Sequence, residues 1–254
     1  MLIDIHCHLD LLGKETSLDE AVALADKKGV LIVAQGVGVE SNREVLKMRE
    51  KYKNVKACFG LYPIDALKLS EKEVDEELKF IEKNKDKIFG IGEVGIDFKE
   101  SVDEKEHVRQ EETFRKIVRL AKKIDKPLIV HSRKAEARVI EILEEEKAEK
   151  VVMHCFNGNF KLVKKIVDNK WFLTIPTCVK SSEHFQKIAK EVPIEQLFCE
   201  TDSPYLHPDK TWPNTPANVE VSYWEIARIK GLKVDEVEKK LEGNLKNLRL
   251  FNIG

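Results

Sequence analysis

The pair His6 and His8 is the first feature of the sequence with the residue types of a metal site. In a β-strand, residues i and i+2 point to the same face, so two imidazoles at this spacing can hold one metal ion. Two ordinary polar residues at the end of a strand are an equally simple explanation of an isolated H-x-H. The pair alone therefore does not establish a metal site.

Further candidate ligands follow other short apolar segments, each placed just past the end of an expected strand. They are Glu93, His131, His154 and Asp202. Parallel strands bring their C-terminal ends to one rim, so nitrogen and oxygen ligands from five strands can converge without being neighbours in sequence. Separate polar residues making local hydrogen bonds are the alternative, and that alternative requires five independent coincidences. The set therefore predicts a metal centre.

The elements that must position these residues are eight short apolar segments rich in β-branched residues. They are Leu2–Ile5, Val30–Ala34, Val55–Phe59, Ile88–Ile91, Leu128–Val130, Val151–Met153, Trp171–Ile175 and Gln196–Cys199. Segments this continuously apolar favour parallel strands that are covered on both faces over half-exposed antiparallel strands.

Polar segments with helical periodicity separate the strands, so strand and helix alternate along the chain. Capping boxes are expected at Ser17–Glu20, Ser41–Glu44 and Ser70–Glu73, and Gly29 has the position of a helix C-cap. Eight such units can form an open doubly wound sheet or a (β/α)8 barrel. The count of eight and the length of 254 residues favour a single TIM-type barrel domain over residues 1–254. The proline-rich stretch 203–217 is the one irregular segment.

The composition bears on which partners and which cysteine-based sites the protein could have. Lys and Arg (44) balance Asp and Glu (45), so net charge indicates neither a nucleic-acid nor a membrane partner. Five scattered cysteines without a C-x-x-C pair argue against a disulfide framework or a thiolate zinc site. No signal peptide or membrane-length apolar run is present, so we expect a cytoplasmic protein, with no obligate protein partner evident.

Five short motifs, in order along the chain, resemble the TatD family of metal-dependent hydrolases. They lie at Asp4–Asp10, Gly92–Asp97, Ile129–Arg133, His154–Gly158 and Glu200–Pro204. The resemblance spans nearly the whole chain. It implies an amidohydrolase-type barrel, DNase activity that needs divalent cations, and a glutamate shared by two metal ions. On this chain the resemblance implies that Glu93 would bridge the two ions. The other ligands of the first ion would be His6, His8 and Asp202, and those of the second ion would be His131 and His154.

Such a centre suits a phosphodiester, because two divalent ions with only two carboxylates leave about two positive charges facing the substrate. A hydroxide shared by the ions would be the nucleophile, and Asp202 is our candidate general base. Four imidazoles favour zinc, manganese, cobalt or nickel as ligand types, whereas nuclease activity in the family is usually supported by magnesium or manganese.

Three residues are candidate substrate contacts. Arg133 could anchor a phosphate or form a surface ion pair, and Asn157 could approach substrate or belong to a turn. Tyr62 occupies the histidine position of the family's G-x-H-P motif and can still donate a hydrogen bond. In the proline-rich loop, Tyr205, His207 and Trp212 could stack on bases or pack against the barrel.

Two functions remain open for an enzyme of this kind. The first is a DNase, and the neutral net charge favours single strands or chain ends as its substrate. The second is hydrolysis of a different ester or amide, such as a small phosphoester, a lactone, a cyclic amide or an aminoacyl-tRNA ester. Tyr62 and the segment Trp212–Pro216, which lacks the family's Arg and Glu, leave the DNA preference open. A non-catalytic scaffold is the third possibility, and retention of all six ligands argues against it.

Overall fold

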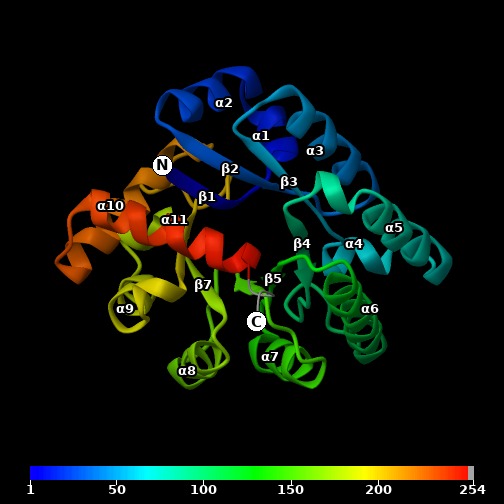
Figure 1. Cartoon of the computed structure of the whole chain (residues 1–254). Coiled ribbons are helices and arrows are strands. Elements are labelled where there is room, and N and C mark those ends of the chain that lie inside the picture. The colour runs from blue at the N-terminus through cyan, green and yellow to red at the C-terminus, as the bar shows by residue number, and fades with distance from the viewer. Residues whose placement is uncertain (251–254) are drawn as a thin grey trace. The chain divides into compact units, whose positions relative to one another are not determined.

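The computed structural model describes residues 1–250, with side chains described as far as residue 248. Its eight strands follow one another in sequence order, β1 to β8, within one hydrogen-bonded sheet. Figure 1 shows the helices and strands of the chain, coloured from the N-terminus to the C-terminus. Every strand pair whose register is resolved is parallel. The strands are β1 (Leu2–Cys7), β2 (Val30–Gln35), β3 (Val55–Phe59), β4 (Gly90–Gly95), β5 (Leu128–His131), β6 (Val151–Met153), β7 (Phe172–Pro176) and β8 (Leu197–Glu200).

Helices separate the strands, and this alternation confirms the predicted (β/α)8 topology. The α-helices are α1 (Leu9–Glu15), α2 (Leu18–Lys27), α3 (Val39–Lys51), α4 (Pro63–Leu67), α5 (Glu71–Lys83), α6 (Glu104–Lys123), α7 (Glu136–Glu145), α8 (Phe160–Asp168), α9 (Glu183–Glu191), α10 (Glu220–Lys230) and α11 (Val234–Leu250). Short 3-10 helices are η1 (Lys85–Lys87), η2 (Thr177–Lys180), η3 (Ile194–Gln196) and η4 (Pro216–Val219). The predicted irregular stretch after β8 is confirmed, since no helix or strand forms between Thr201 and Thr215.

The described residues form two compact units. The first contains residues 1–34, 47–56 and those from 172 onward, and the second contains residues 35–46 and 57–171. In the first unit, Tyr223 of α10 is fully buried, and its hydroxyl accepts a hydrogen bond from the backbone N–H of Ile3 at 2.9 Å. In the second unit, Phe59 and Phe114 are fully buried. Each unit therefore has its own apolar interior beneath its strands.

One of the three expected capping boxes is complete: Ser70 and Glu73 form the reciprocal pair of hydrogen bonds. At the first expected box Ser17 caps its helix by accepting a hydrogen bond from the Glu20 backbone N–H. Gly29 follows α2 with a φ of 69°, the left-handed conformation of a helix terminus. The cap predicted at Ser41 is wrong. Its helix α3 already begins at Val39, and the Ser41 hydroxyl instead accepts a hydrogen bond from Val37 N.

Strands β1 and β4 carry the first two of the five motifs, and each contains a register irregularity. In the first unit, Asp4 pairs with Ile32 and Cys7 with Ala34, so β1 has one residue more than β2 around His6. In the second unit, Ile91 and Val94 pair with Leu128 and Val130, and the extra residue of β4 falls beside Glu93. A bulge re-aims the side chain that it carries. The two irregularities therefore coincide with candidate ligands.

The expectation that each candidate ligand follows the end of its strand needs correction. His6 lies inside β1, Glu93 lies inside β4, and His131 is the last residue of β5. His154 follows β6 directly, and Asp202 comes two residues after β8. The difference arises because β1 and β4 continue beyond the predicted apolar segments into polar and glycine-containing sequence.

No disulfide joins the five cysteines, all of which lie in the described part of the chain, and Cys7, Cys58 and Cys199 are buried. Among residues 1–250, none of the helices combines the length and apolar character required to cross a bilayer.

Candidate metal centre

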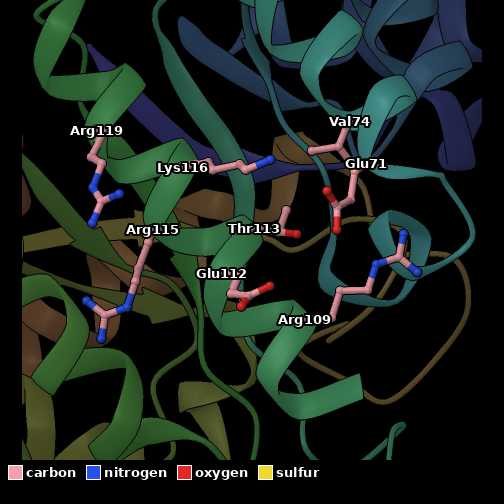
Figure 2. Close-up of a pocket in the computed structure, with 8 residues that line it drawn as sticks. All are labelled: Glu71, Val74, Arg109, Glu112, Thr113, Arg115, Lys116 and Arg119. Atoms are coloured by element: carbon pink, nitrogen blue, oxygen red, sulfur yellow. The ribbon is translucent and has the colours of Figure 1, made fainter. Parts of the chain in front are cut away.

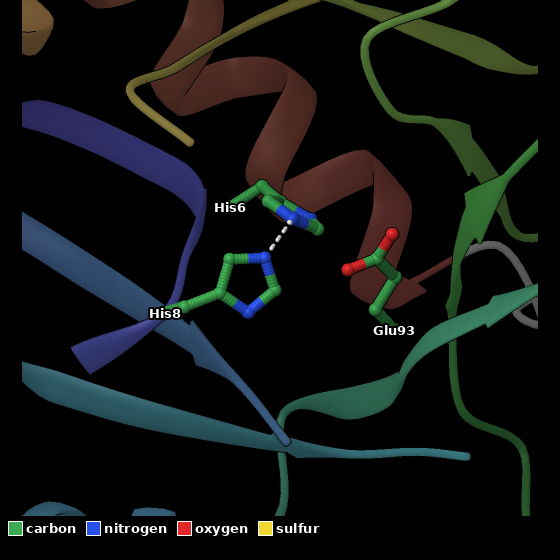
Figure 3. A group of neighbouring side chains, drawn as sticks. All are labelled: His6, His8 and Glu93. Atoms are coloured by element: carbon green, nitrogen blue, oxygen red, sulfur yellow. Dashed lines mark hydrogen bonds between the residues drawn. The ribbon is translucent and has the colours of Figure 1, made fainter. Parts of the chain in front are cut away.

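A first group of candidate ligands, His6, His8 and Asp202, gathers in the first unit. The Nε2 atoms of the two imidazoles lie 3.2 Å apart, as the dashed line in Figure 3 marks. Asp202 Oδ1 lies 3.4 Å from His6 Nε2 and 3.5 Å from His8 Nε2. We call these three residues the first triad. The histidines are buried, and the carboxylate side chain is 15% exposed, so the triad is nearly enclosed.

The spacing of these atoms fits a single metal ion. Ligands at ~2.05 Å from a tetrahedral ion lie ~3.3 Å from one another, and the three measured separations bracket that value. Two neutral imidazoles and one carboxylate also leave one positive charge on a divalent ion. The donor set and its geometry therefore suit zinc or a similar transition-metal ion.

Backbone hydrogen bonds join the two segments that supply the first triad. Asp202 N donates to His6 O at 3.0 Å, and His8 N donates to Ser203 O at 2.7 Å. Behind them the fully buried Asp4 carboxylate accepts from the Thr201 N–H at 2.8 Å and from the Thr201 hydroxyl at 2.5 Å. The segments on either side of the triad are thus tied together at four points.

A second group, Glu93, His131 and His154, gathers in the second unit. His131 Nδ1 lies 2.9 Å from Glu93 Oε1, and His154 Nε2 lies 3.8 Å from the same oxygen. All three ligand atoms lie within 4.8 Å of one another, and Glu93, labelled in Figure 3, is only 4% exposed. We call this group the second triad. It has the same donor types as the first.

Asp97 orients the His131 ring of the second triad. Its Oδ2 lies 3.0 Å from His131 Nε2, and the Tyr62 hydroxyl donates to the same oxygen at 2.8 Å. Its Oδ1 accepts from the backbone N–H groups of Lys99 and Glu100 at 2.8 and 2.9 Å. When one ring nitrogen donates its N–H to a carboxylate, the lone pair of the other nitrogen is left for a metal. Asp97 therefore directs Nδ1 toward Glu93.

The charges around His131 also suit a cation. Although burial lowers the pKa of His131, hydrogen bonds to Asp97 and Glu93 raise it above its usual value. Burial likewise raises the pKa of Asp97, but hydrogen bonds from His131, the Glu100 N–H and Tyr62 lower it to about 2. Both shifts mean that this corner of the second unit stabilises positive charge. A divalent ion bound at the second triad would supply that charge.

Gly95 explains why the motif around Glu93 needs a glycine. Its φ is 146°, and a Cβ atom there would lie 1.9 Å from the His131 carbonyl oxygen. Only glycine permits this approach of β4 to the end of β5. The close contact holds the backbone of His131 beside the segment that carries Glu93.

The three predicted substrate contacts have local partners. Tyr62 donates to Asp97, and burial and that hydrogen bond raise the pKa of its hydroxyl, so it stays neutral. Arg133 pairs with Glu100 at 3.2 Å, and both side chains are about half exposed. Asn157 Nδ2 donates to Cys155 O at 2.8 Å, and Asn157 itself lies after the turn at His154 and Cys155. The Arg133 contact matches the surface ion pair stated above as the alternative. The substrate roles of all three residues remain predictions.

Sequence reasoning assigned no role to Asp4, Thr201 or Asp97, although all three lie inside quoted motifs. Asp4 is two residues before His6, Thr201 directly precedes Asp202, and Asp97 is four residues after Glu93. Their proximity to candidate ligands was the available signal. The contacts that define their roles, by contrast, join segments far apart in the sequence.

A separate groove of about 250 Å³ lies in the second unit between α5 and α6 (Figure 2). Its cations are already engaged: Lys116 pairs with Asp75 at 2.9 Å, and Arg119 pairs with Glu146 at 2.6 Å. Arg109 donates to the backbone carbonyls of Leu67 and Leu69. The groove contains no predicted ligand, and these contacts indicate a structural role.

Comparison with known structures supports the fold. YjjV, a TatD homologue of Escherichia coli K12, superimposes with a TM-score of 0.89 at 24% identity over 98% of this chain and 97% of its own. A TatD family hydrolase of Entamoeba histolytica gives a TM-score of 0.86 at 23% identity, with 98% of each chain covered. The protein therefore has the TIM-type barrel fold of these structures.

Sequence comparison shows the family. The model of "TatD related DNase" matches residues 3–251. An uncharacterized metal-dependent hydrolase of Methanocaldococcus jannaschii is 34% identical over 95% of this chain and 94% of its own length. Deoxyribonuclease TATDN3 of Homo sapiens is also 34% identical, over 98% of this chain and 94% of its own length. The chain therefore belongs to the TatD family of metal-dependent hydrolases.

Proposed function

We propose that the protein is a divalent-metal-dependent deoxyribonuclease that cleaves phosphodiesters in single-stranded DNA or at chain ends. The first triad carries the proposal, because its three ligand atoms are spaced 3.2–3.5 Å apart, a spacing that fits tetrahedral coordination of one metal ion. Relatives that are named as deoxyribonucleases support the choice of substrate.

In this proposal each triad holds one divalent ion. When bound, the two ions supply Lewis acidity, which lowers the pKa of an attacking water and stabilises charge on the phosphoryl group. Each triad contributes two neutral imidazoles and one carboxylate, so the loaded centre keeps about two positive charges to attract a phosphodiester. Magnesium, manganese, zinc, cobalt and nickel all remain candidates.

The protein's own residues position the reactants and move the proton. Asp202 is our candidate general base, because its carboxylate is the one partly exposed member of the first triad. Glu93 is our candidate for the carboxylate shared by both ions, as the family pattern implies. Asp97 and Tyr62 hold His131 in the orientation that exposes Nδ1.

The first test is digestion of end-labelled single-stranded DNA with magnesium or manganese. We expect release of short products, abolished by EDTA and reduced at least about a hundredfold in Glu93→Ala and Asp202→Ala. Asp86→Ala, which removes an exposed carboxylate of η1, is the matched control and should retain full activity.

Elemental analysis of the same preparations separates the alternatives. A protein that holds two ions per chain but leaves DNA intact would contradict the nuclease proposal and favour hydrolysis of another ester or amide. The shared role of Glu93 is tested in parallel with Glu93→Gln. Loss of two ions from that variant supports sharing, and loss of one contradicts it.

A further inference from the structure

Two aromatic rings on the loop after β8 remain exposed beside the first triad. Tyr205 is 46% exposed and Trp212 is 53% exposed, although most large apolar side chains of the described residues are buried. Their ring centroids lie 5.6 Å apart, and the Tyr205 ring lies 6.5 Å from the ring of His8. An aromatic surface thus adjoins a candidate metal ligand.

Hydrogen bonds hold the Trp212 ring and the Tyr205 backbone in place. The Trp212 indole N–H donates to Glu15 Oε2 of α1 at 2.8 Å. The backbone N–H of Tyr205 donates to Asp202 O at 2.8 Å, so its position follows that of the triad. The indole has only one hydrogen-bond donor, and Glu15 already accepts from it. Trp212 can therefore contact a ligand through the face of its ring. The two residues form a preorganised surface, here called the aromatic platform.

The rest of the loop is organised by internal contacts. Fully buried Asn214 donates through Nδ2 to Thr201 O at 2.9 Å, and its N–H donates to Pro204 O at 2.8 Å. His207 Nδ1 accepts from Asp209 N at 3.1 Å and lies 3.0 Å from the Thr211 hydroxyl. The imidazole of His207 therefore serves the loop itself and is not part of the platform.

We propose that the aromatic platform, Tyr205 with Trp212, stacks against an unpaired base of the nucleic acid whose phosphate is held at the first triad. This inference rests on the proposed function. Every base has a π face, so stacking tolerates any sequence, and it requires a base that is not enclosed in a duplex. The Glu15 carboxylate beside Trp212 repels phosphate, which favours a base over the backbone at this position. The platform would thus select single strands and frayed ends.

Binding of two phosphorothioate strands, whose linkages resist cleavage, tests the platform. One is hexathymidylate, and the other is a strand of the same length and linkage built from abasic sites. We expect fluorescence anisotropy to show that the metal-loaded wild type binds hexathymidylate about tenfold more tightly. Trp212→Leu and Tyr205→Leu keep apolar bulk but lack a π face, so each should lose most of this preference while affinity for the abasic strand is unchanged.

Two further variants serve as controls. Trp212→Phe retains a ring and should retain most of the preference. Trp224→Leu removes a tryptophan of α10 that is equally exposed, at 51%, and should behave as wild type. Equal wild-type affinity for both strands would overturn the platform, and so would an equal loss in Trp224→Leu and Trp212→Leu.

Cleavage of ordinary single-stranded DNA by the same preparations decides the proposed function separately. A protein that prefers the base-containing strand but cleaves no DNA supports the platform and contradicts the nuclease. A protein that cleaves DNA but binds both strands equally well supports the nuclease and contradicts the platform.

Discussion

Two buried aspartates, Asp4 beside the first triad and Asp97 beside the second, support their triads in different ways. Both side chains are fully buried, and each belongs to a motif that also supplies a candidate ligand. Burial raises the pKa of Asp4 well above its usual range, and the nearby Glu200 carboxylate adds to this increase. The pKa of Asp97 falls to about 2, because hydrogen bonds from His131, the Glu100 N–H and Tyr62 outweigh its burial.

The difference follows from what each carboxylate contacts. Asp4 accepts hydrogen bonds from backbone N–H groups and a hydroxyl, so it fixes the chain segments that carry His6 and Asp202. Asp97 contacts the His131 ring itself. The first triad is therefore positioned through the backbone and the second through a side chain. Disrupting the support of the first triad should mainly cost stability, whereas disrupting that of the second should mainly cost metal affinity.

The largest effect is expected from Asp97→Asn. An amide cannot supply the charge that fixes the His131 tautomer, so affinity for metal at the second triad, and activity with it, should fall about 10–100-fold. Titration of the metal-free protein by calorimetry measures the affinity. Tyr62→Phe is the graded control: it removes one hydrogen bond to Asp97 but leaves the contact with His131, so its loss should stay below about tenfold. Wild-type affinity in Asp97→Asn would contradict the orienting role.

Thr201→Val should instead lower stability. The substitution keeps the shape of the side chain but removes a hydroxyl that donates to Asp4 and accepts from Ser203 N and Oγ at 3.2 and 2.7 Å. Loss of these buried contacts should lower the free energy of unfolding by about 2 kcal/mol, with metal affinity changed only a few-fold. Urea unfolding measures the first quantity and calorimetry the second. Ser203→Ala should cost about half as much, and a large loss of affinity at unchanged stability would refute this distinction.

Much of the fold could be predicted from apolar segments alone. The bounds of β3 and β6 match the expected strands. β6 is entirely apolar, and β3 is apolar apart from the exposed Lys56. The fourth strand was misplaced: Ile88–Ile91 was expected, and β4 covers Gly90–Gly95. Glycine has low strand propensity, so Gly92 and Gly95 conceal a strand that is stabilised by pairing with β5. Pairing across the sheet is not visible in a single segment.

The residue types of the site could be predicted, but their supporting contacts could not. Two histidines and an aspartate in or just after β1 and β8 indicate a metal site, because parallel strands end at one rim. Nothing in the sequence around Tyr62 shows that its hydroxyl donates to Asp97, 35 positions away. Ser41 likewise has the sequence pattern of a helix cap, yet α3 begins before it and its hydroxyl accepts a hydrogen bond from Val37 N. Long-range contacts and local competition for hydrogen bonds decide these details.

The smallest effect is a pH dependence of opposite sign at the two aspartates, measured on chelated protein. The folded pKa of Asp97, about 2, lies below the usual ~3.9, so its stabilising contribution is present above pH ~4 and declines as pH falls toward 2. The stability difference between wild type and Asp97→Asn should therefore shrink by about 1 kcal/mol from pH 5 to pH 3. The folded pKa of Asp4 is raised, so the folded protein retains a proton that the unfolded chain loses above ~3.9, and the Asp4 contribution declines as pH rises. The stability difference between wild type and Asp4→Asn should accordingly grow from pH 5 to pH 3. Urea unfolding at the two pH values measures both stability differences. If the Asp97→Asn and Asp4→Asn differences changed in the same direction, the two carboxylates would act alike.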